Sequence, residues 1–69
     1  MQRLLNIDDE QRASATISFN VNRFEVHLPS GALMFAVYTA EELERECGRN
    51  RIPLNMDAMA ERQYMKQKG

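Results

Sequence analysis

The feature that most constrains this chain is the alternation of apolar and polar side chains along residues 15–38. Successive side chains of a strand point to opposite faces of a sheet, so a repeat of two residues predicts strands rather than helices. Ile17 and Phe19 share one face of the first strand, and Phe24 begins the same pattern on the second. Residues 13–38 are therefore expected to form an antiparallel β-meander with one apolar face.

The first reversal of the chain is expected at Asn22-Arg23. A two-residue loop there pairs Val21 with Phe24 and keeps every apolar side chain on the same face of the sheet. Asn accepts the positive φ angle of such a turn, whereas Arg is less favourable at the second position, so a longer loop is the alternative.

The second reversal is expected at Ser30-Gly31, because glycine suits a position where the chain turns back. The expected pairs between the second and third strands are Leu28–Leu33, Val26–Phe35 and Phe24–Val37. Three strands then share one apolar face, and the agreement of the two turns supports the meander.

The third strand differs from the other two because it is apolar on both of its faces. Its opposite face carries Met34, Ala36 and Tyr38. A strand of this kind is usually covered on both sides. This opposite face can be covered in three ways: by the N-terminal segment or second helix of this chain, by a second copy of the chain, or by a different protein.

A helix is expected over residues 39–48. Thr39 and Glu42 have the spacing of a capping box, in which each side chain satisfies a backbone N–H of the other residue. Gly48 is placed to end this helix, because glycine readily adopts the left-handed conformation that follows a helix.

A second helix is expected over residues 55–66, with Asn55 as its N-cap. Residues 1–12 are expected to form an N-terminal segment or edge strand, in which residues 1–7 form either a fourth, edge strand or a short helix. The sequence therefore predicts one α+β domain over residues 1–69: an antiparallel three- to four-stranded β-meander followed by two short α-helices.

Composition limits the classes of protein to which the chain can belong. Its 69 residues include nine Lys and Arg against ten Asp and Glu, which gives a formal net charge of −1. Cys47 is the only cysteine, so no internal disulfide forms and a reducing compartment is favoured. The longest apolar run, residues 32–38, is far shorter than the roughly 20 residues that span a bilayer. We expect a cytoplasmic protein with no membrane partner.

The sequence predicts no catalytic residue, no metal site and no cofactor. His27 is the only histidine and is expected in a cross-strand polar contact with Ser18. A zinc site needs at least three protein ligands, and no second histidine or suitably placed cysteine completes one. Cys47 falls late in a helix, where the dipole disfavours a thiolate, so we expect a small buried hydrophobe.

Arginines gather where the first expected helix ends. Arg45, Arg49 and Arg51 lie close together in the sequence, and guanidinium groups at such a junction suit phosphate contacts. Glutamates line the same helix, however, and the sequence pI is about 5.7, whereas nucleic-acid-binding domains usually have a high pI. Binding of nucleic acid through these arginines is therefore the alternative function.

The apolar excess on the third strand favours a protein-binding function, because Met and Tyr are enriched at protein interfaces. The residues expected to bind a partner are Arg23, Met34, Tyr38, Arg45, Arg49 and Arg51. The sequence predicts a small non-catalytic module that acts as an inhibitor, adaptor or regulator by occluding a macromolecular partner, first of all a protein. A homodimer is the further alternative, and an origin in a phage or mobile element is suggested by analogy with size and architecture.

Overall fold

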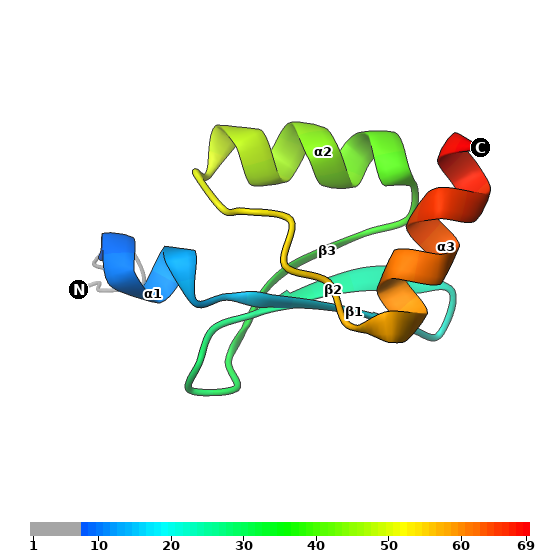
Figure 1. The fold of residues 1–69 in the computed structure, drawn as a ribbon. Helices are drawn as coiled ribbons and strands as arrows, with labels where there is room; N and C mark the ends of the chain where they lie inside the picture. The colour runs from blue at the N-terminus through cyan, green and yellow to red at the C-terminus, as the bar shows by residue number, and fades with distance from the viewer. Residues whose placement is uncertain (1–7) are drawn as a thin grey trace.

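The chain folds as a three-stranded antiparallel sheet with helices on one side of it. The computed structural model describes residues 8–69. Its elements are α1 (Asp9–Ala13), β1 (Thr16–Asn20), β2 (Arg23–His27), β3 (Leu33–Val37), α2 (Ala40–Arg49) and α3 (Ala58–Lys68). The strand order β1-β2-β3 confirms the expected α+β meander. Helix α2 lies across the sheet, with α1 near one end of the molecule and α3 near the other (Figure 1).

The described residues contain three helices rather than the expected two. Helix α1 overlaps residues 1–12, where an N-terminal segment or edge strand is expected, and residues 1–7 lie outside the described residues. Asp8 caps this helix by accepting from the backbone N–H of Gln11 at 2.9 Å. The Gln11 side chain completes a capping box by accepting from the Asp8 backbone N–H.

The first hairpin is displaced by two residues from the expected register. Phe19 pairs with Phe24, and their rings meet edge to face with centroids 5.0 Å apart. The turn consists of Val21-Asn22 rather than Asn22-Arg23. A displacement of two residues keeps every side chain on its face, so the apolar inner face forms as expected. Within this hairpin, only Val21 leaves that face.

The second hairpin has the expected register over most of its length. The confirmed pairs are Val26–Phe35 and Phe24–Val37. Beyond them a β-bulge changes the register, so that His27 lies opposite Leu33 and Met34 is the extra residue. The expected pairing of Leu28 with Leu33 is therefore wrong.

Helix α2 begins at the expected capping box. Oγ1 of Thr39 accepts from the Glu42 backbone N–H at 3.1 Å, and the Glu42 carboxylate accepts from the Thr39 backbone N–H at 3.2 Å. The expected end at Gly48 is wrong, because the helix continues past it to the cap residue Asn50. The left-handed residue that ends this helix is Arg51, with φ of 59°.

The connector between α2 and α3 runs beside β1. The Ile17 backbone N–H donates to the Asn55 carbonyl at 2.9 Å, and the Asp57 backbone N–H donates to the Ile17 carbonyl at 2.9 Å. Met56 thereby forms a parallel bridge with Ile17. The expected cap was wrong: Asn55 contacts β1, and Asp57 caps α3 by accepting from the Ala60 backbone N–H at 2.8 Å.

The core lies between α2 and the inner face of the sheet. Its largest fully buried side chains are Phe24, Ile17, Leu43, Val26 and Cys47. Ile52 of the connector and Ala60 of α3 complete the cluster. Each fully buried large apolar side chain contributes about 1.5–3 kcal/mol. The fold therefore depends on one thin layer between α2 and the inner face of the sheet.

Candidate functional site

The face of the sheet turned away from α2 has no helix over it among the described residues (Figure 1). We call it the outer sheet face. The strand register assigns to it Thr16, Ser18, Asn20, Arg23, Glu25, His27, Leu33 and Ala36, with Tyr38 directly after β3. Hydroxyl and amide side chains thus lie along β1, charged and imidazole side chains along β2, and apolar or aromatic side chains along β3.

A carboxylate lies at the centre of the outer sheet face. Glu25 is 8% exposed, and its Oε2 accepts from Arg23 Nε at 2.9 Å and lies 2.8 Å from Arg23 Nη2. Nε2 of His27 lies 3.9 Å from Glu25 Oε1 on the other side. A buried carboxylate requires such partners, because an unpaired buried charge is strongly unfavourable. The pairing holds the Arg23 guanidinium in a fixed position on this face.

Apolar groups flank this central ion pair. Tyr38 is 64% exposed and Leu33 is 50% exposed, at opposite ends of the β3 side. Val37 pairs with Phe24, so continuation of this register by one residue brings Tyr38 next to Arg23. Met34 is placed differently from the expectation, because it is the extra residue of the bulge and packs against the core. Leu33 replaces it as the exposed apolar residue of this strand.

The turn between β1 and β2 presents an apolar side chain that the sequence analysis placed on the inner face. Val21 has φ of 52° and Asn22 has φ of 63°, as a two-residue type I′ turn requires. Asn tolerates this conformation, but it is rare for a β-branched residue. Val21 is 77% exposed. The turn therefore exposes the apolar side chain of Val21 to solvent, and its backbone conformation is unfavourable for a β-branched residue.

A second candidate site lies where α1 approaches the end of α2. Arg12, Arg49, Asn50 and Arg51 line a hollow of about 360 Å³, which we call the arginine hollow. Arg45, expected in the same patch, is exposed but does not line it. Arg12 is the member that the sequence analysis missed, since nothing local in the sequence relates it to residues 49–51.

The backbone at the arginine hollow is a Schellman motif. The Ile52 backbone N–H donates to the Cys47 carbonyl at 2.8 Å, and the Arg51 backbone N–H donates to the Gly48 carbonyl at 3.3 Å. These two bonds end α2 and leave Arg51 in the left-handed position that glycine usually takes. Ile52 is thereby directed into the core, and Arg51 stays exposed beside the hollow.

The one cysteine faces the core, as expected. Cys47 is 1% exposed. Burial, with a smaller effect from the charge of Glu46, raises the pKa of its thiol to about 11. The thiol is therefore protonated at neutral pH, and Cys47 acts as a small apolar group against Leu43 and its neighbours in the core cluster.

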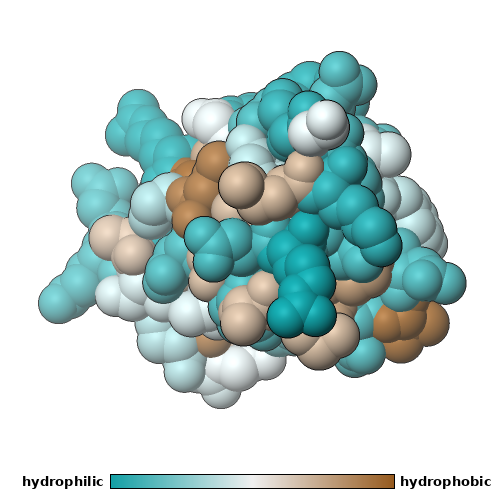
Figure 2. Space-filling view, turned by 45° about the vertical axis from the view of Figure 1, so that its right-hand side comes forward, coloured by the Kyte–Doolittle hydropathy of each residue, from teal (hydrophilic) through white to brown (hydrophobic). Residues whose placement is uncertain are grey.

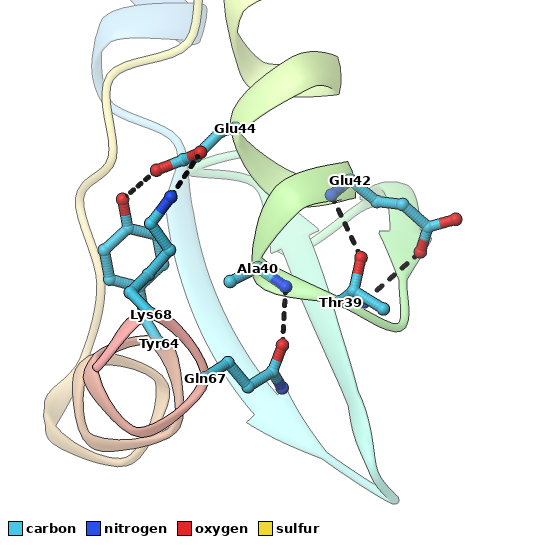
Figure 3. Close-up of polar contacts among 7 residues, drawn as sticks. All are labelled: Thr39, Ala40, Glu42, Glu44, Tyr64, Gln67 and Lys68. Atoms are coloured by element: carbon cyan, nitrogen blue, oxygen red, sulfur yellow. Dashed lines mark hydrogen bonds and ion pairs between the residues drawn. The ribbon is translucent and has the colours of Figure 1, made fainter.

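Polar side chains join α3 to α2 (Figure 3). The Tyr64 hydroxyl donates to Glu44, and Lys68 Nζ donates to the same carboxylate at 3.2 Å. The Ala40 backbone N–H donates to the Gln67 side chain at 2.7 Å. The bonds from Tyr64 and Lys68 lower the pKa of the Glu44 carboxyl, and the pKa values of Tyr64 and Lys68 are raised in turn. This contact explains why α3 continues past residue 66, the expected end of the helix.

The side of the molecule that includes α3 has no continuous apolar patch. In Figure 2 its surface is largely hydrophilic, and the apolar residues emerge in separate small patches. The exposed methionines of α3 are Met59, at 64%, and Met65, at 63%. Apolar residues scattered in this way are normal on a protein surface.

No family model, curated protein or solved structure matches this chain. Within residues 8–69, no helix has the length and apolar character needed to cross a membrane. The same residues contain no group of three or more potential metal ligands. A proposal for the function of the chain therefore depends on the surfaces described above.

Proposed function

We propose that this chain is a non-catalytic protein-binding module whose partner docks on the outer sheet face. The observation that carries the proposal is an ordered ion pair, Arg23 with Glu25, between the exposed side chains of Leu33 and Tyr38. Interfaces between proteins combine apolar anchors with arginine in this way. Because Glu25 already orders the guanidinium of Arg23, binding loses less side-chain entropy there.

The edge of the sheet supports the same proposal. Strand β3 pairs with β2 on one side and with no described strand on the other. An open edge invites an extended segment of another protein, since unpaired backbone groups there accept a further strand. Leu33 and Tyr38 lie at the two ends of this edge strand. A partner that adds along β3 therefore meets both apolar groups.

The charge of the outer sheet face favours a protein over nucleic acid. Its one arginine, Arg23, is neutralised by Glu25 at 2.8 Å, and the whole chain has a net charge of −1. Binding to a nucleic-acid backbone depends on several cations that are free to replace counterions. The module is proposed to act as an inhibitor, adaptor or regulator that occludes its partner, in the cytoplasm, where the reduced Cys47 is stable.

The test is affinity capture with two matched double variants. Leu33→Ser with Tyr38→Ser alters the outer sheet face, and Met59→Ser with Met65→Ser removes the same kind of exposed apolar area from α3. We expect one protein to be retained by the wild type and the α3 variant, with and without nuclease, and to be lost by the sheet variant. Circular dichroism and thermal melting establish that both variants fold.

Two results overturn the proposal. The first is equal loss of the captured protein in both variants, and the second is its disappearance on nuclease treatment. Met34→Ser does not serve in this test, because Met34 packs against the core and its loss alters the fold.

A further inference from the structure

We propose that the arginine hollow binds a phosphate group, carried by a free phosphorylated molecule or by a nucleic-acid backbone. The ligand is held by the guanidinium groups of Arg12, Arg49 and Arg51 and by the amide of Asn50. This site is separate from the outer sheet face, and its occupation does not depend on a protein partner.

The arrangement of the lining residues is the first support. Figure 1 shows α1 beneath the end of α2. There Arg12 of α1, Arg49 of α2 and Arg51 of the connector line a hollow of about 360 Å³. Among the described residues, no carboxylate lines it. Guanidinium groups bind phosphate oxygens through charge-assisted and often paired hydrogen bonds, for which their planar fork is suited.

An unpaired donor is the second support. Nε of Arg12 is buried and has no hydrogen-bond partner among the described residues. Nη1 of Arg12 lies 3.5 Å from Asp9 Oδ1, but the Asp9 side chain is 86% exposed and does not reach Nε. A buried N–H is unfavourable without an acceptor. Arg12, whose Nε is in this state, is also a lining residue of the hollow.

The position of Arg51 is the third support. Its φ of 59° belongs to the left-handed region, where glycine carries no steric penalty and arginine does. Backbone geometry alone therefore does not account for an arginine here. The Arg51 side chain lies at the hollow together with Arg12 and Arg49, where its positive charge favours the binding of an anion.

The negative end of α2 explains only part of the cluster. Arg49 lies in the last turn of α2, where its positive charge interacts favourably with the negative end of the helix dipole. Its Nη1 lies 3.7 Å from Oε2 of Glu46. This exposed pair is weak and exchanges readily with a stronger anion. Arg12 belongs to another helix, and Arg51 follows the end of α2. The helix dipole therefore accounts for the position of Arg49 but not for those of Arg12 and Arg51.

Arg51→Gly separates binding from folding. Glycine fits the left-handed position better, so this variant is expected to melt at or above the temperature of the wild type. Loss of one charge-assisted contact is expected to weaken phosphate binding about tenfold. Arg45→Ala is the matched control, because it removes the same charge from a nearby exposed position on α2 that does not line the hollow. We expect it to leave the affinity within about twofold of the wild type.

The experiment is a titration with inorganic phosphate at constant pH and ionic strength, followed by backbone amide NMR. We expect saturable shifts at Arg12, Asn50 and Arg51, which Arg51→Gly weakens. A parallel titration with a short single-stranded oligothymidylate distinguishes the sources. Tighter, salt-dependent binding at the same amides identifies a nucleic-acid backbone, and preference for free phosphate identifies a small phosphorylated molecule.

Either source supports the site. Shifts that do not saturate at these amides overturn the proposal, and so does an equal loss of affinity in Arg45→Ala, which indicates only nonspecific charge attraction. Neither result affects the outer sheet face, whose test uses other residues.

Discussion

The two faces of the sheet come from alternate residues of the same three strands, yet different interactions stabilise them. On the inner face, Phe24 and Val26 are completely buried against α2 and the connector. On the outer sheet face, Glu25 lies between these two residues in the sequence and is held by an ion pair with Arg23. Alternate positions of one strand therefore have separate roles: the inner set stabilises the fold, and the outer set is proposed to bind a partner.

The largest expected effect comes from truncation of the inner face. Phe24→Ala removes a fully buried ring and is expected to lower the free energy of unfolding by about 3–5 kcal/mol. Tyr38→Ala removes an exposed ring and is expected to change it by less than about 0.5 kcal/mol. Urea denaturation measures both. Similar losses in the two variants contradict the division between the faces.

The ion pair of the outer sheet face has an intermediate effect. Glu25→Ala leaves Arg23 without its partner and is expected to destabilise the fold by about 1–2 kcal/mol. Chemical denaturation gives the value, and Glu41→Ala, an exposed glutamate on α2, is the control, with no measurable change expected. A loss as large as that of Phe24→Ala means that the outer sheet face also determines the fold.

A substitution in the strained turn between β1 and β2 is expected to increase the stability of the fold rather than to decrease it. Val21→Asn relieves the left-handed conformation of a β-branched residue and is expected to stabilise the protein by about 1 kcal/mol. Asn22→Ala has the converse effect, because alanine lacks the tolerance of Asn for positive φ. Thermal melting compares the two variants. A Val21→Asn protein that melts below the wild type argues against strain at this turn.

The smallest effect is a dependence on pH at the contact between α2 and α3. Because the pKa of Glu44 is lowered in the folded chain, its contribution is present at neutral pH and is lost as the pH falls through that lowered pKa. The pKa values of Tyr64 and Lys68 are raised, so their contribution is lost as the pH rises through those raised values.

Melting temperatures of the wild type and Tyr64→Phe across the pH range test this contact. The difference between them is expected to be greatest near neutral pH and to shrink at both extremes. A constant difference contradicts the assigned hydrogen bond. Since the contact lies on the helical side of the sheet, its loss is expected to leave partner capture through the outer sheet face unchanged.

Much of the fold could be predicted because alternation and capping are local signals. The period of two residues assigned the residues of β1 and β2 to their faces, and the capping box at Thr39 and Glu42 located the start of α2. A capping box at Asp8 and Gln11 is the same kind of local signal, and it marks the start of α1. The first turn was misplaced because a β-branched residue rarely adopts positive φ, so Val21 was assigned to the strand.

The candidate sites were less predictable because they depend on contacts between distant segments. The sequence placed Arg23 and Tyr38 on the outer sheet face because both follow the alternation, whereas the bulge moved Met34 to the core and exposed Leu33. The arginine hollow requires α1 to approach the end of α2, which no local pattern specifies. Arg12 was missed for that reason, and Arg45 was included because it is close in sequence only.

The most direct measurement for the central claim is site-specific photo-cross-linking in the cells that produce the protein. A photoreactive phenylalanine analogue replaces Tyr38 on the outer sheet face or Met59 on α3, two positions that are each 64% exposed. The account predicts a covalent adduct with one different protein from position 38 and none from position 59. Equal adducts from both positions, or adducts only with a second copy of the chain, would contradict it.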